Sequence, residues 1–230
     1  MSDFSKFEKK LKISFANPAL LSEALTHRSY LNENPSWGYP HNERLEFLGD
    51  AVLELSVTDH IFRSFPDKPE GDLTSIRAAL VNASMLSSVA TEIGVNEVIL
   101  LSRGEAKDVG RARAAILANA FEALVGALYL DGGFAAADAF IRRFLIPKTS
   151  DILEKKLFRD AKSAFQERAQ EMAGVTPTYR VQKEWGPDHD KHFVVGAYIG
   201  EECVSEGEGP SKQIAEQNAA ENALHAKGWS

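Results

Sequence analysis

Apolar residues dominate two stretches of the chain, positions 41–53 and 115–131, and both have the pattern of a helix. The first reads HNERLEFLGDAVL, and its apolar positions are Leu45, Phe47, Leu48, Ala51, Val52 and Leu53. The second, AILANAFEALVGALYLD, is apolar nearly all round over about four turns. Helices with so few polar positions are expected inside a protein core rather than on its surface.

Acidic side chains follow one line of the first helix. Glu43, Glu46 and Asp50 stand at i, i+3 and i+7, which places them within about 60° of one another around the helix axis. Like charges at these spacings repel, and no lysine lies nearby to compensate them. A divalent cation with oxygen ligands is the natural counter-charge. The alternative interpretation is an acidic face exposed to solvent.

The second helix carries one polar line of its own. Asn119 and Glu122 stand at i and i+3, and an amide oxygen and a carboxylate are both acceptable ligands for Mg²⁺. Two largely apolar helices that each carry one polar line predict a shared cleft where the lines meet.

Helices are predicted along the whole N-terminal part, with no strand before residue 170. Asn17 is a plausible N-cap for the first of them, and Pro66 and Gly94 end two others. The predicted helices cover residues 18–31, 42–65, 72–94, 112–130 and 135–157.

The composition changes near residues 158–160, and the remainder predicts a helix, three strands and a final helix. The predicted elements are a helix over 161–173, strands over 179–185, 192–199 and 201–208, and a helix over 212–226 that Ser211 caps. The fold class expected for the whole chain is therefore an all-α domain followed by a small α+β domain.

The overall composition is that of an ordinary globular protein, with 44% apolar and 26% charged residues among 230. Cys203 is the single cysteine and fits a reducing compartment, and no signal-peptide or membrane-spanning pattern is found, so a cytoplasmic location is expected. The net charge is −7, and residues 160–230 alone carry seven lysines and arginines against twelve acids. Any affinity for nucleic acid must therefore come from a locally organised face and depend steeply on salt.

Residues 42–50, NERLEFLGD, match without a gap the signature of the ribonuclease III family, which this chain resembles. Further matching blocks are PEGDL at 69–73, RAALV at 77–81, LSRGE at 101–105 and ANAFEAL at 118–124. The C-terminal part looks like a double-stranded-RNA-binding domain. The resemblance implies an all-α endonuclease domain over 4–133, its C-terminal helix and a linker over 134–158, and an α-β-β-β-α RNA-binding domain over 159–229.

The resemblance also implies a chemistry: Mg²⁺-dependent hydrolysis of duplex RNA to 5′-phosphate and 3′-hydroxyl ends, with Mn²⁺ able to substitute. The implied metal ligands are Glu46, Asn119 and Glu122. Asp50 and Glu122 would be catalytic and organise the attacking water, and the cleft would also be lined by Glu43 and Glu70. A homodimer would cut both strands of structured precursors (rRNA and mRNA, with tRNA a further candidate), without a small-molecule cofactor or a membrane.

One departure concerns Asn119, because the family most often has aspartate there. An amide keeps a ligating oxygen but loses a negative charge, so we expect an active enzyme with weaker Mg²⁺ affinity. The rival interpretation is a duplex-RNA-binding regulator with an impaired nuclease. A third, a helical phosphohydrolase for small phosphate esters, would leave the C-terminal strands unexplained.

In the RNA-binding domain the resemblance points to four contact residues: Gln166, His189, Ser211 and Lys212. Gln213 and Pro210 stand where the family usually has basic residues, so phosphate binding rests mostly on Lys212. Four further residues keep two interpretations each. Phe47 belongs either to a dimer interface or to the core, Arg111 and Arg113 contact phosphate or lie in a solvated loop, and His27 is more readily a packed residue than a catalytic one.

Overall fold

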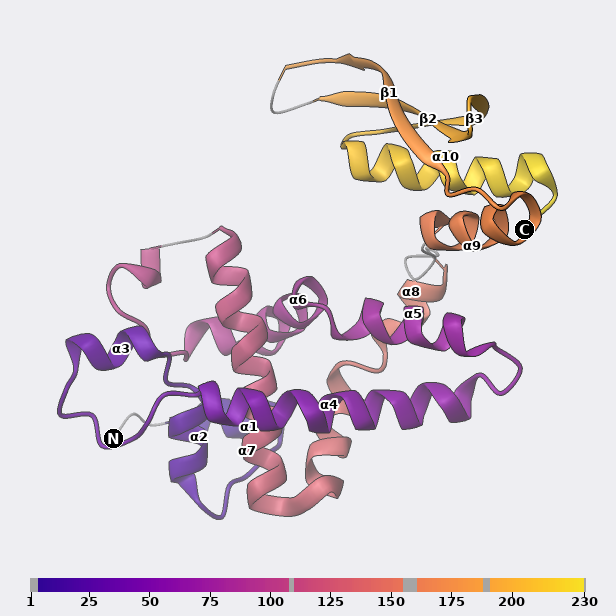
Figure 1. Ribbon diagram of the computed structural model, residues 1–230. Coiled ribbons are helices and arrows are strands. Elements are labelled where there is room, and N and C mark those ends of the chain that lie inside the picture. The colour runs from indigo at the N-terminus through magenta and orange to yellow at the C-terminus, as the bar shows by residue number, and fades with distance from the viewer. Residues whose placement is uncertain (1–3, 108–109, 155–160, 188–190, 230) are drawn as a thin grey trace. The chain divides into compact units, whose positions relative to one another are not determined.

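Two separately packed units, Met1–Phe158 and Arg159–Ser230, make up the chain. The computed structural model describes residues 4–107, 110–154, 161–187 and 191–229 (Figure 1). The described part of the first unit is helical, with no strand and one isolated bridge between Thr26 and Leu100. Its elements are α1 (Ser5–Leu11), α2 (Pro18–Ala24), α3 (Arg28–Glu33), α4 (Glu43–Ser64), α5 (Glu70–Val81), α6 (Ala83–Ile93), η1 (Val95–Glu97), η2 (Glu105–Lys107), α7 (Arg111–Phe144) and α8 (Lys148–Glu154).

The two helices singled out by their apolar pattern cross each other at the centre of this unit (Figure 1). Their crossing point is formed by Gly49 of α4 and Gly126 of α7. A Cβ atom on Gly49 would lie 1.8 Å from the carbonyl oxygen of Glu122, and one on Gly126 would lie 2.2 Å from that of Leu45. Only glycine permits such a close approach of two backbones, so these two residues fix where α4 and α7 meet.

The expectation that α4 is buried all round is wrong. Leu45, Val52, Leu53 and Val57 face the core, but the opposite side of the helix lies at the surface. Three large apolar side chains are exposed there: Phe47 by 83%, Leu55 by 59% and Phe62 by 69%. One apolar stripe of α4 is therefore left without a partner in the single chain.

The helix expected over residues 18–31 is interrupted between α2 and α3. Thr26 is fully buried and its hydroxyl donates to the Ser22 carbonyl at 2.6 Å. The backbone of the interruption pairs with a distant residue, since Leu100 N donates to the Leu25 carbonyl and His27 N to the Leu100 carbonyl. These long-range hydrogen bonds replace those of a continuous helix. Asn17 caps α2 as predicted, accepting from Ala19 N.

Two more expected helices are divided, each for a local reason. Asn82 adopts an extended conformation and its side chain accepts from Met85 N at 2.9 Å, so it ends α5 and caps α6. Gly133 has φ +73° inside α7, so the break expected between residues 130 and 135 is present as a bend within one helix. The last helix ends at Phe144 and α8 begins after Pro147, which cannot donate a helical hydrogen bond.

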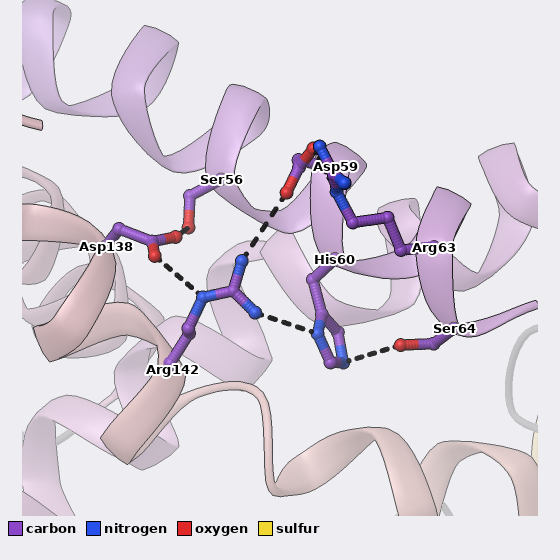
Figure 2. A network of polar contacts seen from close by, with 7 residues as sticks. All are labelled: Ser56, Asp59, His60, Arg63, Ser64, Asp138 and Arg142. Carbon is purple, nitrogen blue, oxygen red and sulfur yellow. Dashed lines mark hydrogen bonds and ion pairs between the residues drawn. The ribbon is translucent and has the colours of Figure 1, made fainter. Parts of the chain in front are cut away.

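Polar contacts tie the second segment of α7 to α4 (Figure 2). The hydroxyl of the buried Ser56 donates to Asp138 at 2.6 Å, and Arg142 donates to the other oxygen of Asp138 at 2.7 Å. Arg142 also reaches Asp59 at 3.5 Å and Nδ1 of His60 at 3.3 Å. Burial, and then the nearby Arg142, lower the pKa of His60, consistent with a neutral ring that accepts from the guanidinium.

Among the described helices, α7 alone is long and apolar enough to cross a bilayer. Of its most apolar window, 61% is buried inside the unit, as expected for the central helix of a helical core.

The second unit confirms the predicted α-β-β-β-α order. It consists of α9 (Ala161–Ala173), β1 (Thr178–Trp185), β2 (His192–Ile199), β3 (Glu202–Gly209) and α10 (Lys212–Lys227). The strands form an antiparallel sheet in the order β1-β2-β3, and α9 and α10 pack together, with Phe165 of α9 and Ala197 of β2 in the shared core. Ser211 caps α10 as predicted, with its hydroxyl accepting from Ile214 N at 3.3 Å.

Candidate active site

The crossing of α4 and α7 brings three acids and one amide together. Glu46 and Asp50 lie on α4 on either side of Gly49, while Asn119 and Glu122 lie on α7 one turn before Gly126. The four form one electrostatic group, because Asp50 and Glu46 both raise the pKa of Glu122, and Asn119 makes a side-chain hydrogen bond with Glu46. We call Glu46, Asp50, Asn119 and Glu122 the acid cluster. The two polar lines predicted from the sequence therefore converge at this crossing.

The cluster keeps its negative charge at an energetic cost. Burial raises the pKa of Glu122 to about 7, with further contributions from the charges of Asp50 and Glu46. Burial also raises the pKa of Glu46, as do the charges of Glu43 and Asp50, while the hydrogen bond with Asn119 lowers it. Half-buried carboxylates that repel one another are stabilised by a cation placed between them.

The donor set fits a hard divalent cation only if the amide takes part. Among the described residues there is no group of three or more histidine, cysteine, aspartate or glutamate side chains arranged to hold a metal ion. Two carboxylates, the Asn119 oxygen and water would together provide the all-oxygen environment that Mg²⁺ requires. In such a site Asn119 would supply a ligand oxygen in addition to those of Glu46 and Glu122.

Glu43 adjoins this group, since its charge raises the pKa of Glu46, and it also has partners of its own. Arg28 of α3 lies 3.4 Å from one of its carboxylate oxygens and His41 Nδ1 lies 3.8 Å from the other. The sequence predicted no side-chain counter-charge near Glu43, because no lysine lies nearby. The structure provides one from Arg28, which is fifteen residues away in sequence. The sequence gives no spacing signal for this pair, because Arg28 and Glu43 belong to different helices.

Glu70, expected in the same cleft, lies elsewhere in the single chain. It begins α5, accepts from the Thr74 hydroxyl at 3.2 Å, and lines a groove of about 240 Å³ together with Thr58 and Phe62. Thr58 is twelve residues beyond Glu46, about 18 Å along α4. The structure therefore does not bring Glu70 to the acid cluster.

Two of the other candidate residues have structural roles. Nδ1 of His27 lies 2.8 Å from the Ser29 hydroxyl, and burial lowers the pKa of the ring, as expected for a packed histidine. Arg113 donates through Nε to Asn96 at 2.9 Å and so ties the start of α7 to η1. Arg111 is exposed at the first position of α7 and keeps both of its interpretations.

The candidate RNA contacts of the second unit are exposed or cap a helix. Gln166 is exposed on α9, and Lys212 is exposed at the start of α10 with Nζ 5.7 Å from the centre of the Phe193 ring. Ser211 uses its hydroxyl as the N-cap of α10. His189 lies outside the described residues.

Comparison with known proteins assigns both units. A family model described as ribonuclease-III-like matches residues 17–149, and a double-stranded RNA binding motif matches residues 161–227. Ribonuclease 3 of Borreliella burgdorferi is 46% identical over 225 residues, which cover 98% of this chain and 91% of that protein. The chain belongs to the ribonuclease III family.

Other members agree with this assignment. Ribonuclease 3 of Bdellovibrio bacteriovorus is 45% identical over 221 residues, covering 96% of this chain and 94% of that protein. The crystal structure of the nuclease domain of ribonuclease III from Campylobacter jejuni matches with a TM-score of 0.57 and 38% identity, covering 64% of this chain and 97% of that one. The protein is thus a double-strand-specific endoribonuclease, with a helical ribonuclease III domain followed by a double-stranded-RNA-binding domain.

Proposed function

We propose that this ribonuclease III cleaves duplex RNA in a Mg²⁺-dependent reaction that leaves 5′-phosphate and 3′-hydroxyl ends, with Mn²⁺ able to replace Mg²⁺. Its substrates would be structured precursors of ribosomal, messenger and transfer RNA in the cytoplasm. The observation that supports this proposal is the acid cluster, where three carboxylates and an amide converge and the pKa of Glu122 is raised to about 7.

In this proposal Glu46, Asn119 and Glu122 hold the ion through their oxygen atoms. When bound, Mg²⁺ neutralises charge on the scissile phosphate and lowers the pKa of a coordinated water. Asp50 and Glu122 accept hydrogen bonds from the attacking water and orient it in line with the leaving oxygen. The carboxylates of Asp50 and Glu122 provide the oxygen atoms that can receive the proton of that water. The cluster holds no hydroxyl or thiol, so water is the proposed nucleophile.

We propose that the active form is a homodimer that pairs through α4. The stripe of Phe47, Leu55 and Phe62 is exposed in the single chain, and a two-fold pairing of such stripes is the commonest way to cover them. A second structure of the Campylobacter jejuni nuclease domain, 39% identical with a TM-score of 0.56, is described as flexible in a region involved in dimer formation. Two sites related by a two-fold axis would cut the two strands of one duplex.

Incubation of the full chain with a perfect RNA duplex of about 40 base pairs, longer than the ~16 base pairs that one RNA-binding domain spans, tests the proposal. We expect staggered double-strand cuts with 5′-phosphates in Mg²⁺ or Mn²⁺ and none in EDTA. The matched control is Glu122→Gln, which should bind the duplex and not cut it. Binding by the natural chain without cleavage in either metal would instead support the second candidate, a duplex-RNA-binding regulator impaired by Asn119.

A further inference from the structure

Helix α1 is anchored in the core on one side and exposes only charged residues on the other. Phe7 and Leu11 are buried, with 4% and 2% of their surfaces exposed, and Phe4 just before the helix is buried as well. The exposed side carries four cations, which we call the lysine face: Lys6, Lys9, Lys10 and Lys12. Because the helix is fixed by its apolar side, these charges are displayed on a rigid element.

The lysine face joins a further cation from the end of α7. Arg143 donates through Nη1 to the carbonyl oxygen of Leu11 at 2.5 Å, and its guanidinium lies 4.7 Å from the centre of the Phe144 ring. Arg143 therefore fastens the end of α1 to α7 and adds positive charge beside the lysines.

The lysine face carries an excess of positive charge within the described part of the chain. None of its four lysines forms an ion pair there, and the one acid of the helix, Glu8, accepts from the backbone N of Phe15 at 3.1 Å. Lys10 and Glu97 approach the same side of Gly94 without forming an ion pair. Other cations of the unit do have partners, such as Lys148 with Glu92 at 2.6 Å and Arg63 with Asp59 at 2.8 Å.

The RNA-binding domain, by contrast, has little positive charge to offer a polyanion. Residues 160–230 carry seven lysines and arginines against twelve acids. Ion pairs between described residues engage four of these cations: Lys162 with Glu216, Arg168 with Glu171, Arg180 with Glu201, and Lys227 with Glu202. An enzyme of net charge −7 that acts on RNA needs a local source of attraction for phosphates.

We propose that the lysine face of α1 is a second contact surface for the phosphate backbone of duplex RNA, separate from the acid cluster. Lysine ammonium groups act as point charges, so contacts of this kind are independent of base sequence and depend on salt. This inference rests on the proposed function in one respect, that duplex RNA is what the enzyme engages.

Two variants with the same change of net charge test the inference. The first replaces Lys6, Lys9 and Lys10 by glutamine, and the second replaces three ion-paired cations of the same unit, Arg63, Lys68 and Lys148, by glutamine. The Kd of each full-length protein for a duplex of about 40 base pairs is measured in EDTA by fluorescence anisotropy over a range of salt concentrations. Thermal melting of each variant verifies that it is folded.

The lysine variant should raise Kd about tenfold and flatten the slope of log K against log salt by about 2, since each phosphate contact contributes close to 0.9. The ion-paired variant should change both quantities little.

Equal effects of the two variants would overturn the inference in favour of net charge alone, and no effect of the lysine variant would overturn it outright. Loss of binding to phosphatidylserine vesicles with unchanged RNA binding would assign the face to membranes instead. Cleavage of the duplex by the parent protein in Mg²⁺ is measured separately. A failure of the proposed function can therefore be distinguished from a failure of this inference.

Discussion

Gly49 of α4 lies directly against the backbone of Glu122 on α7, so close that a Cβ atom at position 49 would stand 1.8 Å from the Glu122 carbonyl oxygen. The same crossing places Glu46 and Asp50, which flank Gly49 on α4, beside the carboxylate of Glu122. The geometry of the acid cluster thus depends on glycines that carry no functional group. Gly49 and Gly126, which have no side-chain chemistry, therefore determine where the acid cluster forms.

Gly126→Ala tests the importance of this crossing. The added Cβ would lie 2.2 Å from the Leu45 carbonyl oxygen, and neither backbone can move without separating the helices. We expect a loss of about 1–3 kcal/mol in the free energy of unfolding, measured by urea denaturation, and reduced cleavage of duplex RNA. Gly71→Ala is the control, since it is also helical and has no atom within 4 Å of the added Cβ. Equal stability of the two variants would contradict a packed crossing.

Asn119→Asp should lower the Mg²⁺ concentration needed for half-maximal cleavage. The aspartate would keep a ligating oxygen and add a negative charge to the acid cluster, which strengthens its attraction for a divalent cation. Titration of cleavage rate against Mg²⁺ measures the effect, with Asn119→Leu as the variant that supplies no oxygen and should lose activity. An unchanged or higher Mg²⁺ requirement for the aspartate variant would contradict the prediction that Asn119 weakens Mg²⁺ binding.

The stability of the metal-free enzyme should fall as pH rises toward and through 7. Burial and the neighbouring acids raise the pKa of Glu122 to about 7 in the folded state, from an ordinary value of 4.5 for glutamate. The folded state therefore binds this proton more tightly than the unfolded state, and the stabilisation is present below pH 4.5 and lost by pH 7 and above. After allowance for solvent screening of a partly exposed group, the contribution is about 1–2 kcal/mol.

Glu122→Gln should remove most of this pH dependence and stabilise the metal-free protein at pH 8. Urea denaturation in EDTA from about pH 5 to 8.5 measures both effects. The exposed Glu167→Gln on α9 serves as control and should leave the profile unchanged. Parallel profiles for the parent and Glu122→Gln would show that Glu122 titrates normally.

Phe47→Asp should dissociate the proposed homodimer. The Phe47 ring is 83% exposed in the single chain, and burial of such a side chain at the centre of an interface contributes about 2 kcal/mol or more. Sedimentation analysis should therefore show a dimer dissociation constant raised by about 30-fold or more. Ile214→Asp changes an apolar residue that is 45% exposed on the RNA-binding domain and should leave the dimer intact. A monomeric parent would refute pairing through α4.

Lys212→Gln should weaken binding to all duplex sequences alike, because an ammonium group at the start of α10 contacts phosphate rather than base edges. We expect the slope of log K against log salt to decrease by about 1. Lys227→Gln at the other end of α10 is the matched control, since Lys227 is paired with Glu202 at 2.9 Å. A sequence-dependent loss of affinity would assign Lys212 to base recognition instead.

Much of the fold could be predicted because its signals are local. The caps at Asn17 and Ser211, and the α-β-β-β-α order after residue 160, depend on contacts between neighbours in sequence and were confirmed. The breaks at Thr26 and Asn82 were missed. At Thr26 a partner 74 residues away, Leu100, supplies the backbone hydrogen bonds that a continuous helix would have made. At Asn82 the apolar pattern continues without interruption on both sides, so the sequence predicted one helix, although Asn82 caps a new one.

By itself the sequence singled out the polar residues of two apolar helices by their spacing, namely Glu43, Glu46, Asp50, Asn119 and Glu122, and the family resemblance selected the expected metal ligands among them. The tertiary structure alone decided which residues meet. It placed Glu70 against the far end of α4, gave Glu43 a partner in Arg28, and left Phe47 exposed in the single chain together with Leu55 and Phe62. The physical reason is that spacing fixes directions around one helix, whereas the packing of several helices, here at Gly49 and Gly126, fixes the distances between them.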